Sequence, residues 1–123
     1  MNGVLVVAHG SRAKETEAAL EAVLAMVRAK LPGIAMECAF MEFSERSLAR
    51  GVASLVAAGV TDIQVVPYFL FMGIHMKEDI PRMVAECAAQ YEGISIAMTE
   101  PLGVDERLAD ILVDRINSAP RGA

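Results

Sequence analysis

The stretch GVLVVAHG, residues 3–10, contains an unbroken apolar run that ends in a histidine and a glycine. No polar residue alternates within the run, so it predicts a β-strand that is buried on both faces. Apolar residues at helical spacing follow it until LPG at residues 31–33 stops the pattern. They are Leu20, Val23, Leu24, Val27 and Leu31. The chain is therefore predicted to open with one strand and one helix.

The same alternation recurs along the rest of the chain. The apolar runs IAMECAFM, DIQVVPYF and ISIAMT, at residues 34–41, 62–69 and 94–99, predict three further strands. Ser44 and Asp79 are expected to be the N-caps of the second and third helices, with Pro81 tolerated in a first turn. The apolar residues at helical spacing after each run are Leu48, Val52, Leu55 and Val56, then Ile80, Met83, Val84, Cys87 and Tyr91, then Leu108, Ile111, Leu112 and Ile116.

Strict alternation of strands and helices predicts an α/β fold. We expect a single three-layer domain, in which a four-stranded parallel sheet has helices on both faces, because parallel neighbours need right-handed crossovers. The usual strand order for so few strands is 2-1-3-4. We assign residues 1–118 to the domain and residues 119–123 to a short flexible tail. Ligands bind such sheets beyond the carboxyl ends of the strands, where the chain direction reverses between strands one and three.

Composition narrows the classes of function. Of 123 residues, 54% are hydrophobic and 22% are charged, which is typical of one compact globular domain. The net charge of -5 argues against a nucleic-acid partner. The apolar runs fall short of the ~20 residues that a membrane span needs, and the start of the chain resembles no signal peptide, so we expect a cytoplasmic protein. Cys38 and Cys87 lack metal-site spacing and are expected to be small buried hydrophobic residues.

Both histidines of the chain are predicted to lie at the same edge of the sheet. His9 ends the first strand and His75 lies just beyond the third, so both would face the switch-point crevice. Glu42 and Glu100 follow the other two strands. Imidazole and carboxylate groups are ligands for a divalent transition metal. The alternative interpretations are structural or solvated histidines, and acids that only favour the start of a helix.

Basic residues lie at the expected helix entrances on this rim. Lys77 falls where the helix dipole disfavours a cation, so contact with an anionic ligand would account for it. Arg12, Lys14 and Arg46 are expected on the same rim. Together these groups would suit a polycarboxylate, and the alternative is that each one is only a solvated surface residue.

The loops on this rim hold more large apolar residues than one strand can bury. For each of them, packing in the core is the alternative to contact with a ligand. A methionine-containing apolar surface beside metal ligands and cations favours a large flat ligand with charged edges, such as a tetrapyrrole. We predict that Arg12, Arg46, Tyr68, Phe71, Met72 and Lys77 bind it. The full apolar set is Met41, Phe43, Tyr68, Phe69, Phe71, Met72, Ile74 and Met76.

Four ordered motifs resemble the small CbiX-type sirohydrochlorin chelatases over nearly the whole chain. They are LVVAHGSR, FMEFSERSL, VVPYFLFMGIHMKEDIP and PLGVDERLADILVDR. The resemblance implies ATP-independent insertion of cobalt, or of nickel or iron, into sirohydrochlorin, with no cofactor beyond that substrate metal. It implies that His9 and His75 bind the metal. It also implies a homodimer, because larger chelatases carry two such domains; we expect the interface to bury part of Met41, Phe43, Phe71 or Met76.

We predict that His9, His75 and Glu42 are the catalytic residues. His75, expected in a mobile loop, is the predicted proton acceptor, and Glu42 would complete the metal shell or relay a proton. One alternative is a non-catalytic tetrapyrrole or metal carrier of the same fold. A histidine phosphatase is a weaker alternative, because those enzymes have an arginine directly before the histidine and Ala8 stands there.

Overall fold

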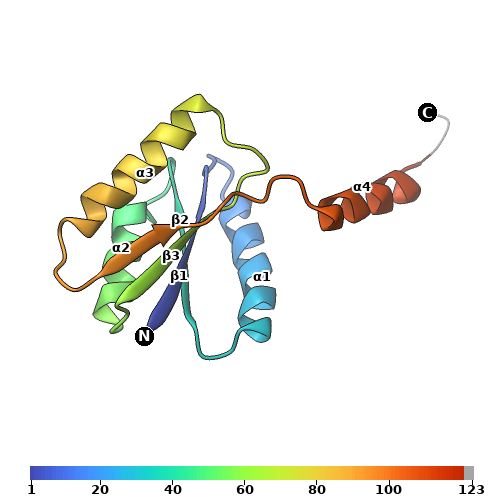
Figure 1. Cartoon of the computed structure of the whole chain (residues 1–123). Helices are drawn as coiled ribbons and strands as arrows, with labels where there is room; N and C mark the ends of the chain where they lie inside the picture. The colour runs from blue at the N-terminus through green and yellow to red at the C-terminus, as the bar shows by residue number, and fades with distance from the viewer. Residues whose placement is uncertain (121–123) are drawn as a thin grey trace.

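The computed structural model describes residues 1–120, so the last part of the expected tail, residues 121–123, lies outside the described residues (Figure 1). Within the described range, no helix is long and apolar enough to cross a membrane. Strands and helices alternate as predicted: β1 (Asn2–Ala8), α1 (Glu15–Lys30), β2 (Ala35–Phe40), α2 (Leu48–Ala57), β3 (Asp62–Pro67), α3 (Ile74–Ala88), β4 (Ser95–Met98) and α4 (Glu106–Ser118).

The four strands form one parallel sheet in the order β2-β1-β3-β4, which confirms the predicted topology. β1 is central, and its Leu5 lies between Glu37 of β2 and Val65 of β3. Leu5 and Val7 have no exposed surface. A central strand that is covered on both faces has no solvent side, which explains the absence of polar alternation in residues 4–8.

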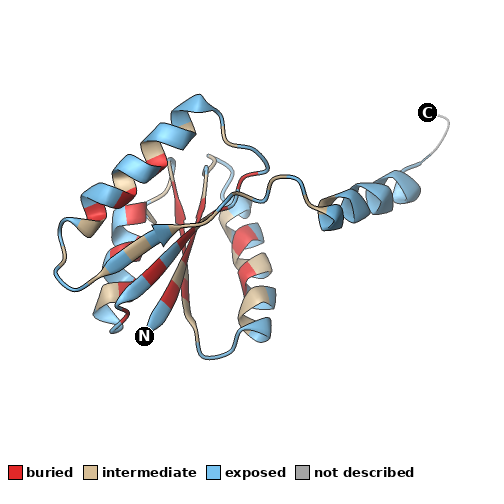
Figure 2. Cartoon of the chain, in the orientation of Figure 1, coloured by how far each residue is buried: buried red, intermediate tan, exposed pale blue. Residues whose placement is uncertain are grey.

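Helices cover both faces of the sheet and create two cores. On one face, α2 and α3 pack on the sheet through a cluster that includes Leu5, Leu55 and Ile80. On the other face, α1 packs on β1 and β2 through Leu20 and Leu24. Figures 1 and 2 show this arrangement, with buried segments along the inner sides of the three helices. The three-layer α/β architecture is confirmed.

The second helix begins later than the sequence predicted. α2 starts at Leu48, and the Oγ of Ser47 accepts a hydrogen bond from the backbone N–H of Arg50 at 3.2 Å. Ser44 instead accepts from the backbone N–H of Arg46 within the preceding loop, at 3.0 Å. The prediction of Ser44 as the N-cap is therefore wrong, since Ser47 also has the side chain that a cap requires and directly precedes the helix.

The third helix begins earlier than predicted. α3 starts at Ile74 after Gly73, so Asp79 lies within the helix and forms an ion pair with Arg82 at 3.2 Å. Pro81 is also inside the helix, where it has no N–H to donate to the carbonyl of Lys77. The prediction of Asp79 as the N-cap is wrong. As a consequence, His75 belongs to a helix and not to a loop, and Lys77 lies in the first turn of that helix.

The fourth helix does not complete the second layer as expected. α4 projects away from the sheet, and none of its residues is buried (Figures 1 and 2). Its amphipathic pattern predicts which face of the helix packs on an apolar surface, but no such surface of this chain contacts α4. α1 is thus the only helix of the described residues that packs on its side of the sheet.

Candidate functional site

The loops that follow the strands meet at the carboxyl edge of the sheet. Backbone hydrogen bonds continue beyond the strands, from Met41 N–H to the Ala8 carbonyl at 2.9 Å and from Tyr68 N–H to the Val7 carbonyl at 2.7 Å. The N–H of Glu42 donates to the carbonyl of His9 at 3.0 Å. These bonds place the start of the loops after β2 and β3 on either side of the end of β1.

His9 stands at the centre of this edge. Its ring is exposed, but it packs on the ring of Phe69 with the centroids 4.3 Å apart and the planes at 53°. Phe69 is only 4% exposed and belongs to the core cluster. An anchored aromatic ring beneath the imidazole limits its rotation, so the structure holds His9 in a fixed direction at the strand end. From the sequence, Phe69 was expected only as one of the apolar residues of the rim.

Gly10 is required for the close approach of two loops. Its φ is +91°, and a Cβ built on it would lie 2.0 Å from the carbonyl oxygen of Glu42. Only glycine fits here, for both the backbone conformation and the contact. The backbones of His9 and Glu42 are thereby held next to each other. The glycine at the end of GVLVVAHG was a usable signal, because a glycine directly after a strand often marks close backbone contact.

The loop after β2 gathers two of the predicted basic residues. Phe43 has a φ of +59°, which is unusual for a residue with a side chain. The guanidinium of Arg12 lies 5.0 Å from the centre of the Phe43 ring, and Nζ of Lys14 donates to the Phe43 carbonyl at 3.4 Å. These contacts bring the segment before α1 to the loop after β2. No sequence signal distinguishes this conformation of a phenylalanine.

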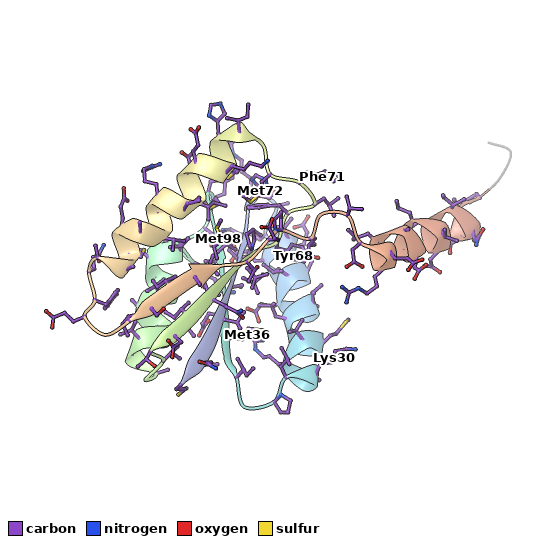
Figure 3. The ribbon with its side chains drawn as sticks, viewed as in Figure 1. Lys30, Met36, Tyr68, Phe71, Met72 and Met98 are labelled. Carbon is purple, nitrogen blue, oxygen red and sulfur yellow. The ribbon has the colours of Figure 1, made fainter. Side chains whose placement is uncertain are left out.

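A hollow opens between the start of α3 and the loop after β4. The loop after β4 is tied to the loop after β3 by backbone bonds from Leu102 to Phe69 at 3.0 Å and from Gly103 to Leu70 at 2.9 Å. Figure 3 shows Phe71 and Met72 at this edge, with Met98 on β4. The hollow therefore combines apolar walls with one cation and one acid. It is lined by Leu70, Phe71, Met72, Lys77, Met98, Thr99, Glu100, Pro101 and Gly103.

A second hollow adjoins His9 on the side of α1. Tyr68 is 38% exposed and forms part of its wall. His75, in the first turn of α3, is exposed and lines neither hollow. The walls of the second hollow are mostly small or apolar: Ala8, His9, Gly10, Ser11, Thr16, Ala19, Leu20, Val23, Phe40 and Tyr68.

Arg46 is engaged away from these hollows, on the outer side of β2. Its guanidinium lies 2.9 Å from a carboxylate oxygen of Glu21 and 4.0 Å from one of Glu37. Hydrogen bonds from the Cys38 thiol, then from Arg46 and Arg28, lower the pKa of Glu21 to about 2. Burial and the Glu21 contact raise the pKa of Cys38 to about 12, so this thiol stays protonated. The predicted role of Arg46 in binding substrate has no support in this geometry.

The predicted metal ligands do not form a closed site within one chain. Among residues 1–120, no three His, Cys, Asp or Glu side chains are placed to hold a metal ion together. His9 and Glu42 are adjacent through their backbones, and both side chains are exposed. A metal bound at this edge would keep several coordination positions open. The roles of His9, His75 and Glu42 stay predictions.

Comparison with known proteins places the chain in a family. Residues 3–119 match the family model described as CbiX. The chain belongs to the CbiX family. Among curated proteins, this CbiX chain is 36% identical to a sirohydrochlorin cobaltochelatase of Sulfurisphaera tokodaii, over 100% of the chain and 98% of that protein. It is 36% identical to a sirohydrochlorin ferrochelatase of Priestia megaterium over 95% of the chain, and 37% identical to a chloroplastic one of Arabidopsis thaliana over 94%.

The chain spans about half the length of these two ferrochelatases, 44% and 51% respectively.

Solved structures support the same family. A CbiX protein of cobalamin biosynthesis from Marinobacter aquaeolei has a TM-score of 0.78 at 31% identity, with 95% of each chain covered. The sirohydrochlorin chelatase SirB of Bacillus subtilis in complex with cobalt has a TM-score of 0.86 at 33% identity, with 94% of this CbiX chain and 50% of SirB covered. The resemblance predicted from the motifs is thereby confirmed.

Proposed function

We propose that this chain inserts a divalent metal ion into sirohydrochlorin without ATP, with cobalt as the first candidate and nickel or iron as the others. The relatives named as sirohydrochlorin chelatases support the reaction class. The observation that carries the proposal is the exposed ring of His9, held on Phe69 at the carboxyl end of the central strand. His75 lies exposed in the first turn of α3, which begins from the loop after the neighbouring strand.

Metal insertion needs groups that bind the metal ion weakly and groups that accept protons from the macrocycle. Two pyrrole N–H protons leave the macrocycle while the metal exchanges its waters for ring nitrogens. A neutral imidazole is able to hold the metal or to accept a proton near neutral pH. We assign metal holding to both histidines, and proton acceptance to His75. Glu42, beside His9, completes the shell or relays a proton, and the reaction requires no cofactor beyond the substrate metal.

The anionic substrate requires local positive potential on a chain of net charge -5. Lys77 in one hollow and Arg12 above Phe43 supply cations at the rim. α3 also begins without a side-chain cap, so its first N–H groups remain available to carboxylates. Tyr68, Phe71 and Met72 would contact the apolar macrocycle, and Phe71 is 74% exposed. We leave Arg46 out of the proposed contacts because Glu21 already pairs with it.

We also propose that the active form is a homodimer. The chain spans about half of the two ferrochelatases, so two copies would match their length. Phe43 and Phe71 are exposed at the edge of the sheet, whereas Met41 and Met76 pack partly against the core. The expected cytoplasmic location stays a prediction.

The test is anaerobic incubation of the chain with sirohydrochlorin and each of Co²⁺, Ni²⁺ and Fe²⁺, followed by the absorption spectrum of the tetrapyrrole. We expect many equivalents of metallated product per chain, above the uncatalysed rate, with at least one of the ions. Product that never exceeds one equivalent per chain would favour the carrier. A rate equal to the uncatalysed rate for all three ions would reject the proposed activity.

A further inference from the structure

Phe69 links the core of the domain to a predicted catalytic residue. The centroid of its ring lies 4.3 Å from that of the His9 ring, so the two rings are in direct contact. Phe69 is 4% exposed, and it packs in the core cluster that also contains Val65 and Ile80. A phenylalanine held in this way offers the imidazole a surface that does not move.

The main chain around Phe69 is held on two sides. The N–H of Tyr68 donates to the carbonyl of Val7 on β1 at 2.7 Å, and the carbonyl of Phe69 accepts from the N–H of Leu102 at 3.0 Å. The first bond joins this segment to the strand that precedes His9. The second joins it to the loop after β4, which forms one wall of the hollow beside α3. Phe69 is thus fixed relative to His9 and relative to that hollow.

The backbone of His9 is fixed, but backbone contacts do not orient its ring. The close approach at Gly10 holds the main chain of His9 beside that of Glu42. Metal-binding histidines are commonly oriented by a hydrogen bond from the second ring nitrogen to a carboxylate or a carbonyl. Among residues 1–120, the His9 ring makes no hydrogen bond of this kind, and its recorded side-chain contact is with Phe69. The aromatic contact therefore limits its rotation within this chain.

We propose that Phe69 is a positioning residue for metal binding by His9, because its ring selects the one orientation of the imidazole that binds the metal. This inference rests on the proposed metal-holding role of His9. Phe69 touches neither the metal nor the macrocycle in this role, since its side chain belongs to the core. It acts by removing the orientations that the imidazole would otherwise have to give up on binding.

The number of available orientations sets the size of the effect. A histidine side chain has three staggered wells for χ1 and two broad ones for χ2, which gives about six orientations. If one of them binds the metal, the apparent dissociation constant is the intrinsic constant divided by the population of that orientation. A ring that samples all of them equally would therefore bind the metal about sixfold more weakly than a ring held in one.

Binding of Co²⁺ in the absence of tetrapyrrole tests the proposal. Phe69→Leu removes the aromatic ring but keeps an apolar side chain in the core, and it should raise the dissociation constant for Co²⁺ about three- to sixfold. The affinity for metal-free sirohydrochlorin should stay unchanged, since Phe69 does not line the hollow beside α3. Phe69→Met gives the same comparison if the leucine variant does not fold, because methionine adapts to irregular gaps.

A core substitution far from His9 is the matched control. Leu55 belongs to the same core cluster as Phe69 and is 2% exposed, but it lies next to Gly3 at the opposite end of β1. Leu55→Ala leaves a cavity, so it should destabilise the chain at least as much as Phe69→Leu in urea unfolding. It should leave the affinity for Co²⁺ unchanged.

Proton NMR of the metal-free chain reports the ring contact itself. The chain has two histidines, so it gives two imidazole Cε1–H signals, and His9→Ala identifies the signal of His9. The ring current of Phe69 displaces that signal, and in Phe69→Leu it should move towards the signal of the exposed His75. Leu55→Ala should leave it in place.

The outcomes separate this inference from the proposed function. Weaker Co²⁺ binding with a moved His9 signal in Phe69→Leu, and neither change in Leu55→Ala, would support positioning. An unchanged Co²⁺ affinity in Phe69→Leu, although His9→Ala weakens binding, would overturn the positioning role alone. So would an equal loss of affinity in Leu55→Ala. Equal Co²⁺ binding by the unsubstituted chain and His9→Ala would instead reject the metal-holding role of His9, and this inference with it.

Discussion

His9 joins two kinds of contact at one position. Its carbonyl accepts from the backbone N–H of Glu42 at 3.0 Å, and its ring packs on Phe69. The backbone contact continues the pairing of β1 and β2 beyond the strands, and the ring contact reaches the core, whereas the imidazole itself is exposed. The fold thus fixes the position of His9, but its exposed side chain contributes little to the stability of the fold. Removal of the imidazole should affect chemistry far more than folding.

The first prediction follows from this difference. His9→Ala and His75→Ala should each remove most of the metal insertion rate, and the double variant should lose little more, because groups that act as a unit are not additive. The free energy of unfolding should fall by about 1 kcal/mol or less in each, since both side chains are exposed. Initial rates and urea unfolding measure the two effects. Near-normal insertion by the double variant would contradict the assignment.

Gly10 allows a second prediction, with Gly33 as its control. Both have positive φ, +91° and +85°, but a Cβ on Gly10 would meet the Glu42 carbonyl whereas one on Gly33 meets nothing within 4 Å. Gly33→Ala should cost about 1 kcal/mol for the backbone conformation alone. Gly10→Ala should cost at least about 2 kcal/mol more, because a backbone atom has to move. Equal losses of unfolding free energy for the two variants in urea would show that the two loops move apart at this contact at little cost.

The residues of the site differ in how far sequence predicts them. His9 was placed correctly at a strand end because the apolar run before it has only one interpretation as an element. Phe43 gave no signal, since a phenylalanine does not mark a left-handed backbone and its contacts with Arg12 and Lys14 come from a distant segment. Arg46 was predicted on the rim from its position alone, but its partner, Glu21, lies 25 residues earlier in the chain, on α1. Pairing of that kind is decided by tertiary structure.

At the scale of elements, Glu21 ties α1 to the edge strand β2. It accepts hydrogen bonds from Cys38 at 3.1 Å, from Arg46 at 2.9 Å and from Arg28 at 3.2 Å. The carboxylate is partly exposed, so solvent screening reduces the contribution of these contacts. The cluster thus holds a helix against a strand with modest but pH-dependent strength.

The third prediction concerns this pH dependence. Glu21→Gln should lower the free energy of unfolding by about 1 kcal/mol at neutral pH. The pKa of Glu21 is lowered from 4.5 to about 2 in the folded chain, so its contribution is complete above pH 4.5 and is lost as the pH falls towards 2. Urea unfolding across this range should show wild type and variant converging. A difference that stays constant down to pH 2 would contradict the role of the ionised carboxylate.

The fourth prediction concerns the start of α3. Lys77→Glu should weaken sirohydrochlorin binding about fivefold or more at low salt, because it replaces a cation in the hollow with an anion. Lys30→Glu makes the same charge change in the last turn of α1, away from the site (Figure 3), and should leave the affinity unchanged. Fluorescence titration measures both. Equal effects of the two changes would indicate only long-range attraction.

The start of α3 also shows why helix boundaries were harder to predict than helices. Asp79 followed two residues later by Pro81 has the composition of a helix start. The actual start at Ile74 has no capping side chain, and Gly73 before it gave no signal. The start of α3 thus lacks the residue types by which a helix start is recognised in a sequence.

At the scale of the whole molecule, amphipathic pattern predicted four helices but not the surface that each one covers. Leu108, Ile111, Leu112 and Ile116 recur at helical spacing as clearly as the core residues of α2. The apolar spacing identifies the face of a helix that packs on another surface. It carries no information on whether that surface belongs to the same chain or to another one. The strand order and the layers were predicted because they depend on connections within the chain.

The fifth prediction follows from the proposed homodimer. If dimerisation is coupled to folding, the midpoint of thermal unfolding should rise by about 5 °C for a hundredfold rise in protein concentration. Calorimetry at two concentrations measures it. A midpoint that is independent of concentration in the unsubstituted chain would contradict coupled dimerisation.

The charged cluster on β2 has a further consequence for the behaviour of the protein at high concentration. β2 is an edge of the sheet, and an unprotected edge strand is a template for uncontrolled addition of strands from other molecules. Here Arg28 donates to the carbonyl of Met36 at 3.1 Å, and the carbonyl of Arg46 accepts from the N–H of Phe40 at 2.7 Å. Two backbone groups of the strand are thus already satisfied, and charged side chains flank it. The contact from Arg28 that fastens α1 therefore also occupies part of the edge where a further strand would add.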